Sequence, residues 1–215
     1  MHELEDGHEY EFVEGTFDSP MSEGEHFSVK HFACLMTQPI ILTQAAHTPG
    51  IESLASKDHR FYSLWNPDEP STLVEALAQL DRYVEDEGPF DAVLGFSAGC
   101  TLASIYMMQK QQQGRQQPFK CAVFLSCGPI STEMGLLGLQ QGGPNGPNQR
   151  LRIPTAHIWG SADEVSTTSG AELFELCEAG PKRQMLVHDG GHEVPRKDYL
   201  TESVHVIRKV TSHAL

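Results

Sequence analysis

The chain alternates short apolar segments with amphipathic segments from residue 71 onward, and this alternation limits the fold more than any other feature of the sequence. Apolar residues recur at helical spacing in some segments and form continuous runs, typical of buried strands, in others. Strands that alternate with helices favour a parallel sheet covered by helices on both faces. We therefore expect strands at residues 91–94, 121–125, 155–159 and 184–188, and helices at about 72–87, 98–112, 172–177 and 199–211.

The segment Gly95-Phe96-Ser97-Ala98-Gly99 matches the G-x-S-x-G pattern at a predicted strand-to-helix junction. This setting is typical of a nucleophile elbow, in which a tight turn lifts the serine above the sheet and small neighbours let strand and helix approach closely. The helix that follows would place the backbone N–H of Ala98 near a developing oxyanion. Ser97 is therefore the predicted nucleophile, and the alternative is a serine that caps the helix.

A serine nucleophile needs a base and a group that orients the base, and at a strand–turn–helix elbow the chain order is serine, acid, histidine. Asp163 lies just beyond the predicted strand at 155–159 and is the predicted acid, with the adjacent Glu164 as an alternative. The motif order and the parallel sheet together predict one domain of the α/β-hydrolase fold over residues 1–215.

His192 follows two glycines directly after the strand at 184–188, where the backbone is free to turn the imidazole back toward the sheet. It combines a post-strand loop with the required chain order, so it is the predicted general base. His157 and His188 fall within predicted strands and are interpreted as packing residues with satisfied ring nitrogens. His205 belongs to the last predicted helix.

The composition limits the partners and the compartment of the chain. Its 29 acidic residues against 15 Lys and Arg give a formal net charge of −14, which disfavours nucleic acid and membranes as partners. The N-terminal residues are acidic and carry no apolar secretory segment. The five cysteines show no paired or C-x-x-C spacing, so we expect a reducing, cytoplasmic compartment and no redox function; they are Cys34, Cys100, Cys121, Cys127 and Cys177.

Residues 16–70 contain five prolines and no clear periodicity, so no long helix or strand is expected there. Four potential metal ligands in this region lack the spacing of zinc sites, so neither a metal nor another cofactor is expected; they are His26, His31, Cys34 and His47. The segment 131–150 is rich in Gly, Leu and Gln. We interpret it either as a lid loop over the site or as a plain flexible connector.

Five motifs together resemble those of the fungal-type family of small serine hydrolases (FSH family). They are Tyr10–Phe17, Phe61–Trp65, Gly95–Gly99, His157–Asp163 and Gly190–His192. This family includes an ovarian-tumour-associated hydrolase and esterases and thioesterases of fungal polyketide clusters. The resemblance implies hydrolysis of a carboxylic ester or thioester by Ser97, Asp163 and His192, without metal or organic cofactor. It also implies a small acyl substrate and, in fungal secondary metabolism, the acyl carrier domain of a polyketide synthase as a partner.

The chain departs from the family pattern at its N-terminal end. Family members open with a strand, a Leu-His-Gly-x-Gly type loop that supplies the second oxyanion donor, and a helix. No His-Gly-x-Gly occurs in this sequence. We therefore expect the fold to lack the family's first strand, its oxyanion loop and the helix that follows.

Two classes of function follow from these features. The first is hydrolysis through an acyl-enzyme, with acyl transfer to an alcohol or amine as a variant that uses the same residues. The second is a catalytically impaired relative that binds a ligand or a partner protein. The missing oxyanion loop favours the second class, and the complete set of Ser97, Asp163 and His192 favours the first.

Residues 22–48 stand where family members have a short connection, and their composition favours neither strand nor helix. We interpret them as an insertion or as a translated intron in a mis-spliced gene, and the alternative is a real lineage-specific loop. Sequencing the transcript tests this interpretation. A message that starts at Met1 and encodes residues 22–48 would contradict it.

Overall fold

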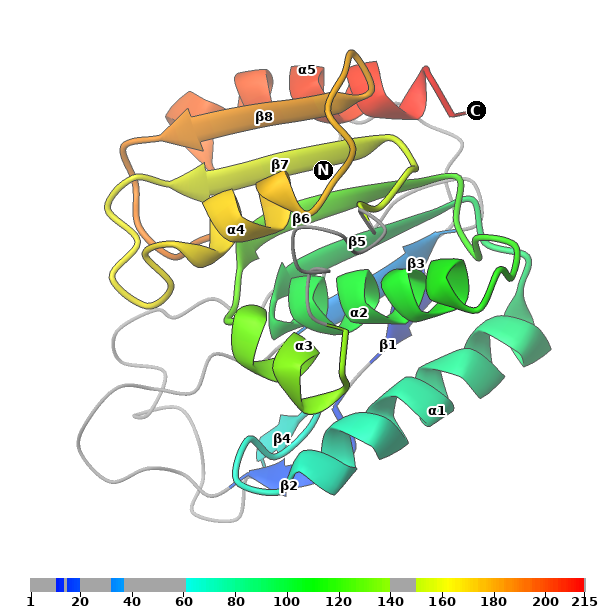
Figure 1. Cartoon of the computed structure of the whole chain (residues 1–215). Coiled ribbons are helices and arrows are strands. Elements are labelled where there is room, and N and C mark those ends of the chain that lie inside the picture. The colour runs from blue at the N-terminus through cyan, green and yellow to red at the C-terminus, as the bar shows by residue number, and fades with distance from the viewer. Residues whose placement is uncertain (1–10, 14, 20–31, 37–60, 140–149, 215) are drawn as a thin grey trace.

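Six strands form one mainly parallel sheet in the computed structural model, which describes residues 11–13, 15–19, 32–36, 61–139 and 150–214 (Figure 1). They are β1 (Glu11–Val13), β3 (Phe32–Met36), β5 (Ala92–Ser97), β6 (Cys121–Cys127), β7 (Thr155–Gly160) and β8 (Arg183–His188). The strand order is β1-β3-β5-β6-β7-β8, in which β5 to β8 run parallel and β3 pairs antiparallel with β1 and β5. The predicted parallel sheet is confirmed.

Helices cover both faces of the sheet, as the alternation predicted (Figure 1). They are α1 (Pro70–Glu87), α2 (Ala98–Gln112), α3 (Ser131–Leu136), α4 (Ser169–Glu175) and α5 (Leu200–Thr211), with a 3-10 turn, η2 (Lys197–Tyr199), before α5. α5 packs on β7 and β8 from one face, whereas α2 and α4 pack on the other face and α1 lies against α2. Among the described residues, no helix is long and apolar enough to cross a membrane.

The different distributions of apolar residues on α1 and α2 follow from where each helix lies. Nearly every side chain of α2 from Ala98 to Met108 is buried, because the sheet covers one side of the helix and α1 covers another. α1 is amphipathic and buries Leu73, Leu77 and Leu80 against the core. A helix buried all round carries apolar residues all round, and a surface helix carries them on one stripe.

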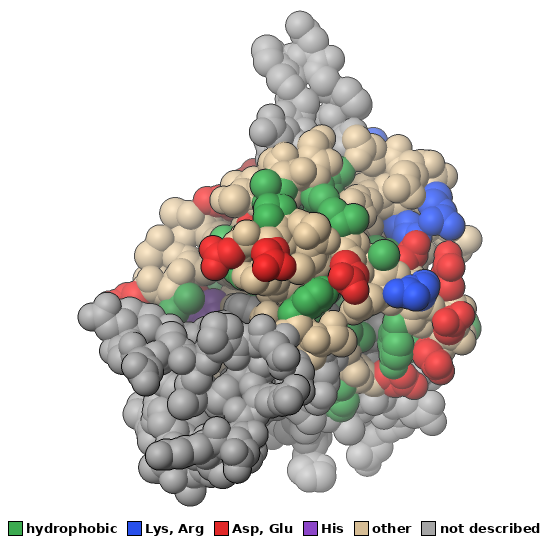
Figure 2. Space-filling view, turned by 90° about the horizontal axis from the view of Figure 1, so that it is seen from below, with side chains coloured by type: hydrophobic (Ala, Val, Ile, Leu, Met, Phe, Trp, Pro, Cys, Tyr) green, Lys and Arg blue, Asp and Glu red, His purple; other side chains and the backbone are tan. Residues whose placement is uncertain are grey.

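The outer face of α1 is rich in acidic side chains (Figure 2). Glu75, Glu85, Asp86 and Glu87 are exposed on this helix. Figure 2, seen from below Figure 1, shows acidic side chains spread over this face with a smaller group of Lys and Arg at one end. Such a surface repels phosphate groups.

The described part of residues 16–70 contains three short strands. β2 (Phe17–Ser19) and β4 (Phe61–Ser63) form a separate antiparallel ladder, and β3 belongs to the main sheet. The prediction that residues 22–48 favour neither strand nor helix is therefore wrong at β3. The physical reason is long-range, because β3 gains ladder partners on both sides from β1 and β5, which are distant in sequence. The rest of 22–48 lies outside the described residues, and its interpretation as an insertion stays a prediction.

Two further predictions fall partly outside the described residues. The predicted loss of a first strand, an oxyanion loop and a helix concerns the N-terminal end, where residues 1–10 are not described. In the predicted lid at 131–150, the first six residues form α3, while residues 140–149 lie outside the described part of the chain. Both stay predictions.

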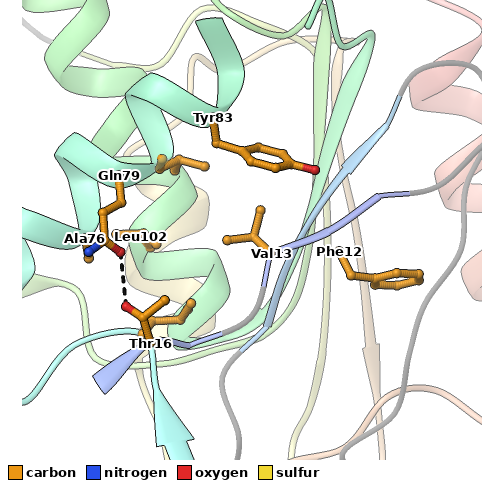
Figure 3. A pocket seen from close by; sticks show the side chains of 9 residues that line it. Phe12, Val13, Thr16, Ala76, Gln79, Tyr83 and Leu102 are labelled. Carbon is orange, nitrogen blue, oxygen red and sulfur yellow. Dashed lines mark hydrogen bonds between the residues drawn. The ribbon is translucent and has the colours of Figure 1, made fainter. Parts of the chain in front are cut away.

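A cavity of about 450 Å³ lies between β1, α1 and α2 (Figure 3). Figure 3 shows Val13 pointing toward α1 and Phe12 pointing away from it, as successive residues of a strand do. Beside the cavity, the Thr16 hydroxyl donates to Oε1 of Gln79 at 3.0 Å. None of the residues predicted for the active site lines this cavity, which is mainly apolar.

The cysteines whose side chains are described belong to the core. Cys100, Cys121, Cys127 and Cys177 are free and buried. Burial raises the pKa of Cys121 and of Cys177 to about 12, so both thiols stay protonated at neutral pH. A protonated, buried thiol is a poor nucleophile, so these cysteines act as small apolar packing residues.

His157 is buried in β7, with its ring centroid 5.2 Å from those of both Phe124 and Phe174. Its Nε2 lies 3.0 Å from the Thr155 hydroxyl. Burial, assisted by the charge of Arg183, lowers the pKa of His157 to about 3. The imidazole is therefore neutral at neutral pH and acts as a packing residue, as predicted.

We predict that His157 makes the free energy of unfolding depend on pH. Its pKa in the folded state lies below the value of about 6.5 in the unfolded chain, so its contribution is fully present above pH 6.5 and is lost as the pH falls toward 3. Between pH 5.5 and 4, wild type should lose about 1.4 kcal/mol per pH unit more than His157→Gln. Urea unfolding over this range measures the difference.

The matched control for this experiment is His205→Gln, because His205 is exposed on α5. This variant removes an imidazole outside the core, so it shows how losing a histidine that is not buried affects the pH slope. Equal slopes for wild type and His157→Gln would contradict a buried, neutral His157, whatever the absolute stability of the variant.

Candidate active site

Ser97 occupies a sharp turn between β5 and α2. Its φ of 54° and ψ of −123° lie in a region that residues with a Cβ rarely adopt. The turn brings strand and helix so close that a Cβ on Gly95 would lie 2.6 Å from the backbone nitrogen of Cys100. The Gly128 N–H donates to the Ser97 carbonyl at 3.0 Å and so supports the turn from the end of β6. This is the backbone geometry that the elbow motif predicted.

The Ser97 hydroxyl makes no capping hydrogen bond, although the residue directly precedes α2. Its Oγ lies instead 2.9 Å from Nε2 of His192. Ser97 is only 2 % exposed, so this contact is shielded from water. The alternative interpretation of Ser97 as a helix cap therefore does not fit the structure.

Asp163 follows β7 and accepts three hydrogen bonds. Oδ1 accepts from the backbone N–H of Val165 at 3.0 Å and of Ser166 at 2.8 Å, and Oδ2 lies 2.7 Å from Nδ1 of His192. Burial by itself raises the pKa of Asp163, but these hydrogen bonds outweigh burial and lower it. The carboxylate is therefore ionised at neutral pH. The alternative acid, Glu164, is exposed.

His192 reaches the site on the loop that follows β8. In a neutral imidazole whose Nδ1 donates to the ionised Asp163, which can only accept, Nε2 carries the lone pair and accepts from the Ser97 hydroxyl. The Phe96 ring packs beside the imidazole, with centroids 5.3 Å apart. The three residues predicted for the site are thus brought together in one continuous chain of hydrogen bonds.

The loops after β7 and β8 hold each other in place through their backbones. The Ser161 N–H donates to the His188 carbonyl at 2.7 Å, and the Ala162 N–H donates to the Gly190 carbonyl at 3.0 Å. The loops approach so closely that a Cβ on Gly160 would lie 2.0 Å from the Gly190 carbonyl oxygen. The position of the predicted acid, Asp163, is therefore tied to the position of the predicted base, His192.

Ser126 was not among the residues predicted for the site. It is fully buried near the end of β6, has a φ of 43°, and donates its hydroxyl to the carbonyl of Glu193 at 3.0 Å. This bond fixes the backbone directly after His192. Ser126 lies near the end of the next strand along the chain after the elbow, and the ends of parallel strands meet at one edge of the sheet. This position was the signal in the sequence that could have placed Ser126 near the site.

The structure offers no metal centre among the residues that it describes. In residues 11–13, 15–19, 61–139 and 150–214, no group of three or more His, Cys, Asp and Glu side chains is placed so that it could hold a metal ion. Of the four potential ligands considered in the sequence, His26, His31 and His47 lie outside the described residues, and Cys34 belongs to β3.

The arrangement can move a proton from Ser97 to His192 while Asp163 balances the charge that forms on the imidazole. The Ala98 N–H begins α2 beside the serine, where the positive end of the helix dipole favours negative charge. These are the elements of nucleophilic catalysis on an acyl group.

We predict that Asp163→Asn lowers stability in a pH-dependent way. The pKa of Asp163 is lowered in the folded state, so the carboxylate contributes stability above the unfolded value of about 3.9, and this contribution is lost as the pH falls through the folded pKa. Wild type should be more stable than Asp163→Asn at pH 7, and the two should converge below about pH 4. Urea unfolding from pH 7 to pH 3 measures this; a difference that stays constant would contradict the prediction.

Comparisons with known proteins agree with this geometry. Residues 2–204 match the profile described as serine hydrolase (FSH1). Esterase FPY3 of Fusarium mangiferae is 32% identical over 174 residues, which cover 78% of this chain and 77% of FPY3. Hydrolase phiM of a fungal species is 26% identical over 145 residues, 64% of this chain and 65% of phiM. Esterase OVCA2 of Bos taurus is 31% identical over 135 residues, 63% of this chain and 56% of OVCA2.

The match spans most of the chain and includes the turn at Ser97 and the loops that carry Asp163 and His192. A serine on a strand-to-helix turn, followed along the chain by an acid and a histidine at later strand ends, is the arrangement of the α/β-hydrolase fold. The chain belongs to the serine hydrolase (FSH1) family.

Proposed function

We propose that the chain is a serine esterase or thioesterase in which Ser97 is the nucleophile, His192 the general base and Asp163 the residue that orients it. The observation that supports this most directly is the continuous chain of hydrogen bonds, 2.7 Å from Asp163 to His192 and 2.9 Å from His192 to Ser97. A buried serine is a poor nucleophile by itself, and a neutral imidazole with a free lone pair is the base that it needs.

In the proposed first step, Ser97 Oγ attacks the carbonyl carbon of an ester or thioester while its proton passes to Nε2 of His192. The substrate oxygen becomes negative and accepts from the Ala98 N–H at the start of α2. As the carbon–oxygen or carbon–sulfur bond breaks, His192 returns the proton to the leaving alcohol or thiol. An acyl group then remains on Ser97.

In the second step, water replaces the leaving group. His192 takes a proton from the water, the resulting hydroxide attacks the acyl carbon, and Ser97 regains its proton as the acid departs. An alcohol or amine in place of water would give acyl transfer with the same residues. Asp163 remains ionised throughout and stabilises the imidazolium that forms twice in each cycle.

A carrier-bound polyketide thioester is the finer substrate class that we propose. The support is the resemblance to the esterases and thioesterases of fungal clusters, together with relatives that carry the name esterase, such as FPY3 and FUS5. A thioester is well suited to this site, because its thiol leaving group needs little protonation. Hydrolysis of short acyl thioesters, compared with oxygen esters of the same acyl group, would test this preference.

A second candidate function is ligand or partner binding without turnover. Residues 1–215 contain no His-Gly-x-Gly segment of the kind that supplies a second oxyanion donor, and a site with one donor fewer typically loses about 10²–10³ in turnover. The hydrogen-bond chain through His192 favours the enzyme.

We predict that a fluorophosphonate probe forms one covalent adduct with the chain, because an activated serine attacks phosphorus and expels fluoride. The adduct should be absent in Ser97→Ala, and His192→Gln should slow labelling by at least about a thousandfold. Intact-mass spectrometry measures both effects.

The matched control is Ser104→Ala, since Ser104 is a buried serine of α2 whose hydroxyl bonds the Thr101 carbonyl away from the site. This variant should be labelled like wild type. An adduct that survives in Ser97→Ala, or no adduct on folded wild type, would contradict the proposed enzyme, and the second outcome would favour the binding function.

A further inference from the structure

His188 ends β8 four residues before the proposed base, and its ring is 5 % exposed and stacked on Tyr199 with centroids 4.7 Å apart. The Gly190 N–H donates to Nδ1 of His188 at 3.1 Å. The other ring nitrogen, Nε2, is buried and has no hydrogen-bond partner in the described part of the chain. The prediction that both ring nitrogens are satisfied is therefore wrong for His188.

The unpartnered Nε2 shows that packing alone does not explain an imidazole at this position. A buried polar atom without a partner costs stability, and an apolar side chain would fill the same space without that cost. What the imidazole supplies is the Nδ1 acceptor. That acceptor receives the hydrogen bond of the Gly190 N–H, at the start of the turn toward His192.

The environment keeps this acceptor available. Burial lowers the pKa of His188, although the negative charges of Glu193, Asp189 and Asp163 act to raise it. The ring is therefore neutral at neutral pH. Because Gly190 donates to Nδ1, the proton of the neutral ring is on Nε2.

The turn held by His188 is coupled to the acid loop. The Gly190 amide donates to His188 while the Gly190 carbonyl accepts from the Ala162 N–H, one residue before the proposed acid. The N–H belongs to the Asp189–Gly190 peptide and the carbonyl to the Gly190–Gly191 peptide, so a change of backbone torsion at Gly190 would disturb at least one of the two contacts. It would also displace the imidazole of His192, which must stay within hydrogen-bond reach of two partners.

We propose that His188 is a positioning residue, whose Nδ1 holds the Gly190 amide and thereby sets the turn that carries His192 into the site. The inference rests on the proposed function, because its consequence is the reactivity of Ser97. A displacement of about 1 Å at a reacting group costs up to about a hundredfold in rate.

The test compares His188→Asn with His188→Leu in the full chain. The two side chains have nearly the same shape, and both lose the ring that stacks on Tyr199. Asn keeps an acceptor oxygen at the position of Nδ1, and Leu does not. The readouts are the rate of fluorophosphonate labelling of Ser97, the hydrogen exchange of the Gly190 amide by NMR, and the thermal unfolding midpoint.

We expect His188→Leu to label about 10- to 100-fold more slowly than wild type and to lose protection at the Gly190 amide. His188→Asn should keep most of the labelling rate and the protection. Its unfolding midpoint should be no higher than that of His188→Leu, since Asn buries polar atoms. If His188 were needed only for packing, the more stable of the two variants would also be the more reactive one.

Equal losses in the two variants, or no loss in either, would overturn the positioning role. If wild type is folded but is not labelled at all, the proposed function fails. Protection of the Gly190 amide then decides the role of His188 alone: protection kept in His188→Asn and lost in His188→Leu would support it, and any other pattern would overturn it.

Discussion

Parallel pairing of β5, β6, β7 and β8 is the constraint on which the site depends, because parallel strands present their carboxyl ends at one edge of the sheet. Ser97 ends β5, Asp163 follows β7 and His192 follows β8. β6 lies between β5 and β7 and supports the site, since Ser126 holds the backbone after His192 and Gly128 holds the turn at Ser97. Side chains far apart in the chain therefore meet without any long loop having to reach across the molecule.

Close backbone approach makes this edge stiff. β5 and α2 meet at Gly95, where a side chain would collide with the first turn of the helix, and the loops after β7 and β8 meet at Gly160 in the same way. The backbone hydrogen bonds from Ser161 and Ala162 join those two loops. The proposed acid and base are thus positioned by the same contacts, so a change in one loop is expected to disturb the other.

Local environment assigns different roles to side chains of the same type. Three histidines lie on or just after β7 and β8, yet His157 is a neutral packing residue, His188 holds a backbone amide, and His192 bridges the acid and the serine. Burial lowers the pKa of the first two. Hydrogen bonds lower the pKa of Asp163 in spite of its burial and keep it charged beside His192. Whether burial or hydrogen bonding prevails decides which group is charged.

The sequence by itself predicted the long helices and the parallel strands from residue 71 onward and the elbow at Ser97, because hydrophobic periodicity and glycine placement are local properties; it did not predict the short α3. It also limited the predicted acid to Asp163 or Glu164 and the predicted base to His192. Only the tertiary structure placed Asp163 within hydrogen-bond distance of His192, placed β3 between β1 and β5, and revealed the contacts of Ser126. Each of these depends on contacts between segments distant in the chain, and such contacts leave no periodic signal in the residues that make them.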